Sequence, residues 1–392
     1  MFRIVPRLAW IARTSISGLL VIGCAEVLAP TVSAEDYSAI TDVLVIDPRA
    51  LPNYSAQPLP VYYLPQILTR EVRAPVTNPI TNAGATLGRV LFFDTQLSRT
   101  NSIACASCHL QSRAFGDTAR FSRGLDGVGE TGAHSMRLAN ARFNESGQYF
   151  WDRRAATLEA QATMPIRDAV EMGFDEANGG LAALISRLAS LAYYPPLFRL
   201  AFGDGAINED RIQRAVAQYV RSILAVNSRW DVAFSQLPSA PGAPLNFQAP
   251  LAGFTAAESR GQTLYFAPKN AGGAGCQGCH VAPSFSLAAN SLNNGLDAGE
   301  VRAFRAPSLK NVAESVRFMH DGRFTSLEEV VEFYNSGIQS ASGLDARLKN
   351  PGGDPQRLNL SAADKAALVA FLRTLTDQSV GVDPRFADPF RP

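Results

Sequence analysis

The sequence predicts a mainly α-helical protein with two domains. Amphipathic helical patterns run over residues 181–191, 209–226, 326–334 and 361–375, and no segment shows the alternation of apolar and polar residues typical of strands. Two blocks of the chain repeat each other, and a Pro-rich stretch separates them. The 392 residues, 46% hydrophobic and 18% charged, are enough for two folded cores.

The charge balance excludes one class of partner. Lys and Arg number 36 against 35 Asp and Glu, which gives a net charge of +1. A protein that grips nucleic acid needs an excess of positive charge facing the phosphates, so no nucleic-acid partner is expected.

The N-terminus is predicted to direct export. A short apolar run from Ile16 to Cys24 follows Arg3, Arg7 and Arg13, and this run is too short to span a bilayer. An uncleaved membrane anchor is the less favoured interpretation. Because an export signal leads out of the cytoplasm, the predicted location is the periplasm.

Two endings of this signal stay open. Val32-Ser33-Ala34 is a small-residue cleavage site, which would make residues 1–34 a signal peptide. Val21-Ile22-Gly23-Cys24 is similar to a lipoprotein processing site, which would make residues 1–23 the signal and Cys24 a lipid anchor.

Proline content sets the predicted domain boundaries. Seven Pro between residues 44 and 80 predict an extended arm that lies over the surface and is not a core element. Four Pro between residues 238 and 250 predict a linker. The predicted order is the N-terminal arm (35–80), the N-terminal domain (81–237), the linker (238–254), the C-terminal domain (255–380) and a tail (381–392).

The repeated blocks each contain a glycine and a cysteine motif. Leu87–Phe93 precedes Cys105-Ala-Ser-Cys108-His109, and Arg260–Phe266 precedes Cys276-Gln-Gly-Cys279-His280. Each glycine-containing stretch is predicted to belong to a short amphipathic helix, and a capping box formed by Thr255 and Glu258 marks the start of the second.

Cys-x-x-Cys-His is the attachment signature of c-type haem. Two thiols on one helical turn form thioethers to one porphyrin, and the adjacent His ligates the iron. The alternatives are a zinc site built from both pairs, in which each His would be surplus, or a redox dithiol. The motifs therefore favour two c-type haems, and of the five Cys only Cys24 lies outside them.

Two further motifs follow the first cysteine motif, and two follow the second: in chain order they are Phe150-Trp151-Asp-Arg-Arg-Ala155, Ala169-Val-Glu171-Met172, Arg305-Ala-Pro-Ser-Leu-Lys-Asn311 and Phe318-Met-His-Asp-Gly322. With this ordered set, about four-fifths of the chain resembles the bacterial di-haem cytochrome c peroxidase family, which includes the MauG-type enzymes. The resemblance implies two cytochrome-c-like helical domains, each with one covalent c-type haem. The N-terminal haem would react with hydrogen peroxide, and the C-terminal haem would supply or store oxidising equivalents.

The resemblance also implies site residues around the N-terminal haem. Trp151 matches the aromatic residue between the two haems, although a Trp can equally be an ordinary core residue. Glu171 matches the distal carboxylate, and such a group in an apolar pocket can move a proton between the two peroxide oxygens. Its alternative is a solvated helix-end Glu. Gln161 and Pro165 fall at positions that line the distal pocket in relatives.

The second ligand of the C-terminal haem is a departure from the peroxidase pattern. Where the peroxidases have a Met, the register from His320 gives Tyr334, and a Tyr ligand is a feature of the MauG-type branch. Leu327, Val330 and Val331 share its helical face. A phenolate would favour higher oxidation states of iron. Met319 is the rival ligand.

His134 has three interpretations. The loop Gly124–Gly132, with four Gly, is predicted to be mobile enough to act as a gate. His134, which follows this loop, could be a gating iron ligand, a residue of a calcium shell or a plain surface His. The family's other calcium ligands are backbone carbonyls, here of Ser315 and Arg317 by register, so one calcium ion stays an open prediction. His320 is predicted to be structural, near the second haem.

The leading functional hypothesis is a di-haem peroxidase that reduces hydrogen peroxide to water with electrons from a small cytochrome c or copper protein. A MauG-like enzyme, which oxidises Trp or Tyr of a partner protein through high-valent iron, is the alternative that Tyr334 supports. Against it, Ala274 stands where MauG has a surface Trp. A non-enzymatic di-haem electron carrier is the third hypothesis. Monomer and homodimer both stay open.

Overall fold

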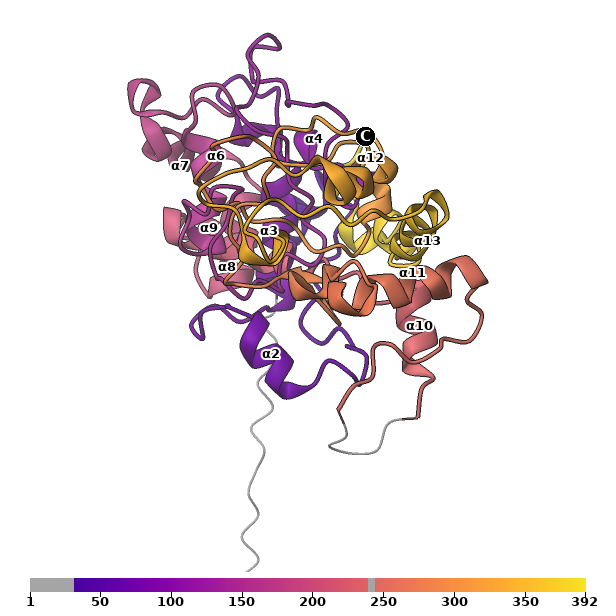
Figure 1. Cartoon of the computed structure of the whole chain (residues 1–392). Helices are drawn as coiled ribbons and strands as arrows, with labels where there is room; N and C mark the ends of the chain where they lie inside the picture. Colours follow the sequence, from indigo (N-terminus) through magenta and orange to yellow (C-terminus); the bar gives the residue numbers. More distant parts are fainter. Residues whose placement is uncertain (1–31, 239–243) are drawn as a thin grey trace, which may run out of the picture. The chain divides into compact units, whose positions relative to one another are not determined.

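The computed structural model describes residues 32–238 and 244–392, and its fold is mainly α-helical as predicted (Figure 1). The α-helices are α1 (Ala34–Thr41), α2 (Pro65–Glu71), α3 (Asn82–Phe93), α4 (Cys105–Cys108), α5 (Leu158–Ala162), α6 (Met164–Arg167), α7 (Gly180–Ser190), α8 (Tyr194–Phe202), α9 (Glu209–Ser222), α10 (Arg229–Ser235), α11 (Ala256–Phe266), α12 (Leu327–Glu332) and α13 (Ala362–Arg373).

The four longest predicted patterns correspond to α7, α9, α12 and α13. The predicted helix over residues 326–334 stops earlier, because α12 ends at Glu332 and a π-helical turn, η7 (Phe333–Gly337), follows it. Across the described ranges, the only paired strands are β1 (His280–Val281) and β2 (Ser286–Leu287), which are antiparallel with His280 opposite Leu287.

The repeat seen in the sequence is a repeated helix crossing. α3 packs on α9, and α11 packs on α13. A Cβ atom added to Gly88 would lie 2.0 Å from the Ala215 carbonyl oxygen, and one added to Gly261 would lie 1.9 Å from the Ala367 carbonyl oxygen. Because real Cβ atoms do not approach an oxygen so closely, only glycine allows either crossing.

Buried apolar residues form two large clusters. The first contains α3, α8 and α9 with the buried C-terminal Phe386, and the second contains α10, α11 and α13 around the fully buried Trp230. Lys310 lies in the second, 0% exposed, with its Nζ 2.6 Å from Asp231 Oδ1 and 4.5 Å from the centroid of the Trp230 ring. A buried ammonium needs such an ion pair and hydrogen bonds to be tolerated.

The prediction that the Pro-rich segment lies over the surface outside the core is wrong. Tyr54 belongs to the first cluster, and Tyr62 and Tyr63 belong to the second, each at most 5% exposed. Prolines prevent a long helix, but they leave the aromatic side chains between them free to be buried. The carboxylate of Glu71 is also buried, where it accepts hydrogen bonds from Arg70 and Ser284.

The predicted export signal lies almost entirely outside the described residues. Residues 1–31, which include Cys24, are not among the described residues. Of the predicted cleavage site, Ser33 caps α1 by accepting a hydrogen bond from the Asp36 backbone N–H. Among the described helices, none alone has the length and apolar character to cross a membrane; α7 with the turn before it and α8, bent by 101°, meet those two criteria only as a pair.

The glycine crossings predict a large effect of one methyl group. We expect Gly88→Ala and Gly261→Ala each to destabilise the protein by about 1–3 kcal/mol or more, because the helices must separate. Gly132→Ala is the matched control, since nothing lies within 4 Å of its added Cβ. Denaturant unfolding measures all three, and equal stability of Gly88→Ala and Gly132→Ala would contradict the close crossing.

Candidate functional site

The first cysteine motif lines a cavity of about 570 Å³. The single-turn helix α4 places Cys105 and Cys108 on the same wall, and His109 follows at its end. The His109 Nδ1 donates a hydrogen bond to the Phe115 carbonyl oxygen at 2.9 Å. This bond fixes the ring and leaves Nε2 without a proton, which is the form of imidazole that ligates metals.

The second cysteine motif lines a separate cavity. Cys276 and Cys279 lie at the ends of a short 3-10 turn, and His280 begins β1. The Tyr265 hydroxyl donates to the His280 carbonyl oxygen at 2.6 Å and holds its main chain. The His280 Nδ1 is buried with no hydrogen-bond partner among the described residues.

Burial keeps these groups neutral. It raises the pKa of Cys105 and of Cys276 to about 12 each, and it lowers the pKa of His280 to about 4. A zinc site shared by both pairs is wrong, because the pairs line different cavities, and no group of three or more His, Cys, Asp or Glu in the described ranges is placed to hold a metal ion. A redox dithiol is disfavoured, because reactive thiols have a lowered pKa.

The donor set in each cavity fits a c-type haem. Two thiols next to a neutral His, in a cavity with mostly apolar walls, are the groups that such a cofactor requires. Cys105, Cys108 and His109 would hold one haem, and Cys276, Cys279 and His280 would hold the other.

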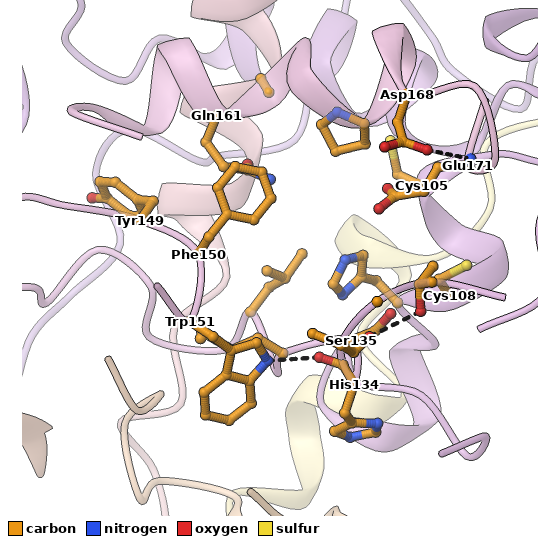
Figure 2. Close-up of a pocket in the computed structure, with 18 of the residues that line it drawn as sticks. Cys105, Cys108, His134, Ser135, Tyr149, Phe150, Trp151, Gln161, Asp168 and Glu171 are labelled. Carbon is orange, nitrogen blue, oxygen red and sulfur yellow. Dashed lines mark hydrogen bonds between the residues drawn. The ribbon is translucent and has the colours of Figure 1, made fainter. Parts of the chain in front are cut away.

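Glu171 stands on a turn that backbone hydrogen bonds fix from both sides. The Asp168 carboxylate accepts from the Glu171 backbone N–H at 3.0 Å, as Figure 2 shows. The Leu125 N–H donates to the Val170 carbonyl oxygen at 2.9 Å, and the Arg99 N–H donates to the Met172 carbonyl oxygen at 2.8 Å. The side chain of Glu171 is thereby aimed into the first cavity from a fixed main chain.

The Glu171 carboxyl group has an unusual proton affinity. Burial raises its pKa to about 7, the negative charge of Asp168 adds to the rise, and the positive charge of Arg154 opposes it. A carboxyl group with a pKa near neutrality can both accept and return a proton at physiological pH. The alternative of an ordinary solvated Glu does not match this environment.

Gln161 and Pro165 line the same cavity as Glu171. Gln161 is on α5, which Thr157 caps, and Pro165 is in the first turn of α6, where it needs no backbone N–H. Figure 2 shows the Phe150 ring beside Gln161. The structure thus brings Gln161, Pro165 and Glu171 together with Cys105 and His109.

Trp151 lines both cavities, as do Phe304, Arg305 and His320. Its indole N–H donates to the His134 carbonyl oxygen at 2.7 Å (Figure 2), and the Arg305 N–H donates to the Trp151 carbonyl oxygen at 2.7 Å. The His320 ring stacks on Phe304 with a centroid distance of 4.0 Å. Aromatic rings therefore occupy the wall between the cavities.

His134 is not a plain surface residue, because it is only 6% exposed. Its Nδ1 donates to the Ala119 carbonyl oxygen at 3.1 Å, and Figure 2 shows its ring directed away from Cys105 and Glu171. The loop Gly124–Gly132 forms a hairpin, since Arg123 pairs with Glu130 and the Leu125 backbone bonds to Val170. His134 thus lines the first cavity, but its ring is not directed toward Cys105 as the ring of a gating ligand would be.

Tyr334 and Met319 both line the second cavity, with Leu327, Val330 and Val331. Tyr334 lies in the π-helical turn η7, where the extra residue per turn shifts the side-chain direction. The Asn294 Nδ2 lies 3.4 Å from the Tyr334 Oη and 3.8 Å from the Met319 Sδ. Burial raises the pKa of Tyr334 to about 12.

Calcium stays a prediction, and one contact weighs against it. The Arg137 guanidinium donates to the Ser315 hydroxyl and, at 2.6 Å, to the Ser308 carbonyl oxygen. A fixed positive charge next to Ser315 opposes a cation at the carbonyls of Ser315 and Arg317.

Sequence reasoning missed four residues that shape the cavities: Phe150, Arg154, Asp168 and Asn294. Phe150 and Arg154 stand in the motif around Trp151, and Asp168 precedes Glu171 by three residues in an Asx-turn pattern, so a local signal existed for these three. Asn294 had none, because its neighbours in space are 25 and 40 residues away along the chain.

Comparison with known proteins identifies the family. Residues 82–237 match the family described as di-haem cytochrome c peroxidase. The chain is 32% identical over 320 residues to methylamine utilization protein MauG of Methylophilus methylotrophus, which covers 78% of this chain and 85% of the relative. The chain belongs to the di-haem cytochrome c peroxidase family.

Members of this family with other names are also similar to the chain. Cytochrome-c peroxidase IdrP1 of Denitromonas iodatirespirans is 27% identical over 366 residues, which cover 82% of this chain and 89% of that protein. A solved MauG-like protein associated with microbial copper homeostasis is 30% identical, with a TM-score of 0.65 over 83% of this chain and 98% of the other. The chain is thus a haem-dependent oxidoreductase, and the hypothesis of a non-enzymatic carrier is wrong.

The charge of Asp168 predicts a measurable change at Glu171. Asp168→Asn keeps the oxygen that accepts the turn's N–H bonds but removes the negative charge, so the pKa of Glu171 should fall from about 7 toward its ordinary value. Infrared titration of the carboxyl band, assigned by its loss in Glu171→Gln, measures this pKa. If the pKa of Glu171 is the same in Asp168→Asn as in the native protein, the charge of Asp168 does not contribute to the raised pKa.

Proposed function

We propose that this protein reduces hydrogen peroxide to water in its first cavity, with two electrons and two protons consumed for each peroxide. One observation carries the proposal: the half-buried carboxyl group of Glu171, whose pKa partial burial raises to about 7, faces the same cavity as Cys105, Cys108 and His109. A site that only transfers electrons has no use for a proton carrier in that place.

Cys105, Cys108 and His109 would hold a haem, and its iron would supply the redox chemistry that peroxide reduction requires. Glu171 accepts a proton from one peroxide oxygen and returns it to the other, which leaves as water. Gln161 orients the peroxide by a hydrogen bond, and Pro165 keeps competing water out of the pocket.

Trp151 provides the route for electrons between the two sites. Its indole lies in the wall that both cavities share, and two backbone hydrogen bonds hold it there. Cys276, Cys279 and His280 would hold the second haem, which would supply a redox centre for electrons from a partner, and Trp151 stands in the wall between this site and the first. We assign residues 81–237 and 255–380 as the two haem domains.

The partner is a small reduced cytochrome c or copper protein in the periplasm. The second candidate is a MauG-like reaction, in which the electrons come from Trp or Tyr side chains of a protein substrate. Tyr334 favours this candidate, because its hydroxyl lines the second cavity and a phenolate ligand would favour oxidised iron.

Turnover of hydrogen peroxide with reduced cytochrome c tests the proposal directly. Oxidation of two cytochromes per peroxide supports it. Rapid reaction with peroxide but no oxidation of cytochrome c or of a reduced copper protein would direct attention to a protein substrate. Absence of any reaction with peroxide would overturn it.

Glu171→Gln should leave both haems bound and slow the peroxide step about 10²- to 10⁴-fold. In the native protein, the carboxylate form is the base, so the rate should rise with pH through about 7 and then level off. Stopped-flow measurements across pH check both statements. A native rate that does not depend on pH, or a variant as fast as the native protein, would make Glu171 a bystander.

Both cysteine motifs should carry their haems covalently. We expect intact mass after acid–acetone extraction to correspond to the polypeptide with two haems, because thioethers survive this treatment whereas iron ligation does not. Cys276→Ser with Cys279→Ser should lose one haem and keep the other. Loss of either haem from the native protein would contradict the assignment.

Tyr334→Met should raise the reduction potential of the second haem, because a thioether stabilises ferrous iron more than a phenolate does. Redox titration measures the potential, and the near-infrared band of a Met–iron bond should appear in the variant. If the native protein already shows that band, Met319 or another Met is the ligand, and the MauG-like candidate loses its main support.

A further inference from the structure

A second pocket, of about 320 Å³, lies outside the first cavity and shares part of its wall. The shared residues are Phe150, Arg154, Pro165, Asp168 and Glu171. Met164 and Arg167 line only the outer pocket. These five residues therefore form the wall that the outer pocket and the first cavity have in common.

Arg154 is the adjustable member of this set. Pro165 is a rigid ring within α6, so it cannot move without a change of backbone. The Arg154 side chain is 48% exposed and is held by two weak contacts. Its guanidinium lies 3.6 Å from the centroid of the Phe150 ring, and its NH1 lies 2.9 Å from Asp152 Oδ1.

The two cationic side chains of the outer pocket are already paired. Arg154 pairs with Asp152, and Arg167 pairs with Glu209 at 2.7 Å. These pairs leave neither arginine free to attract an anion, and the carboxyl groups of Asp168 and Glu171 in the same wall disfavour one. The pocket therefore suits a small neutral molecule.

We infer that the outer pocket is the path by which neutral peroxide reaches Glu171, and that Arg154, stacked on Phe150, sets the largest molecule that passes. The inference rests on the proposed function for the identity of the substrate. Arg154 acts here as a specificity-determining residue: it narrows the passage by its bulk and does not take part in proton transfer.

Ligand binding to the ferric holoprotein tests the passage without turnover. Cyanide is a small probe and imidazole a large one, and stopped-flow absorbance gives the association rate constant of each. Arg154→Ala should raise the imidazole-to-cyanide ratio at least about tenfold, the scale on which sites discriminate by size. Arg199→Ala is the matched control, since Arg199 is 50% exposed and pairs with Asp36 but lies outside both pockets.

A filling variant provides the opposite change. Met164→Trp occupies the outer pocket without altering the wall of the inner cavity, so the association of both probes and of hydrogen peroxide should slow. It also keeps the test valid if Arg154→Ala does not fold. Unchanged rate constants in Met164→Trp, or an unchanged ratio in a folded Arg154→Ala, would overturn the inference.

The same measurements separate this inference from the proposed function. The ratio of cumene hydroperoxide to hydrogen peroxide reactivity should rise in Arg154→Ala as the imidazole ratio does. A protein that binds both probes but never reacts with peroxide would refute the proposed function alone. A protein that reacts with hydrogen peroxide while Arg154→Ala leaves both ratios unchanged would refute the passage alone.

Discussion

The arrangement of the two cavities depends on how the main chain holds Trp151. Its indole N–H donates to the His134 carbonyl oxygen, and the His134 N–H in turn donates to the His320 carbonyl oxygen at 2.9 Å. The Arg305 N–H donates to the carbonyl oxygen of Trp151 itself. Residues 134, 151, 305 and 320 are thereby joined by backbone groups, whose loss in a buried place would cost about 1–3 kcal/mol each. The indole cannot leave the wall between the cavities unless this pairing breaks.

Backbone hydrogen bonds also hold the turn that carries Glu171, whose carboxyl group has a pKa of about 7. Burial of Glu171 disfavours its charged form, and an unrestrained side chain would turn toward solvent to regain hydration. The hydrogen bonds from Leu125 and Arg99 to the carbonyl oxygens on either side of Glu171 prevent the turn from rotating. The hairpin that contains Leu125, which its glycines led us to interpret as a mobile gate, therefore supports the distal pocket in this state.

Local patterns in the sequence predicted α3, α7, α9, α11, α12 and α13, and they located Gly88 and Gly261 in equivalent places. They failed where the outcome depended on contacts between distant segments. The burial of Tyr62, whose hydroxyl bonds to Asp231, could not follow from a Pro-rich composition. The π-helical turn at Tyr334 was also hidden, because an α-helical register already placed that residue on the apolar face. The position of Asn294 between two candidate ligands required the tertiary fold.

The two halves have the same glycine crossing and the same cysteine motif, so their chemical difference comes from the segment that faces each motif across its cavity. In the first half, α5, α6 and the turn after them present Gln161, Pro165 and Glu171, and an outer pocket adjoins them. In the second half, α12 and η7 present Tyr334, with Met319 and Asn294 beside it, in a cavity that holds a thioether and a phenol. A haem site that leaves room for substrate beside a proton carrier suits reaction with peroxide. A haem site in which protein side chains can ligate the iron suits the storage of oxidising equivalents. Under the proposed function, one repeated scaffold would divide peroxide chemistry from electron supply through side chains that lie outside the repeat.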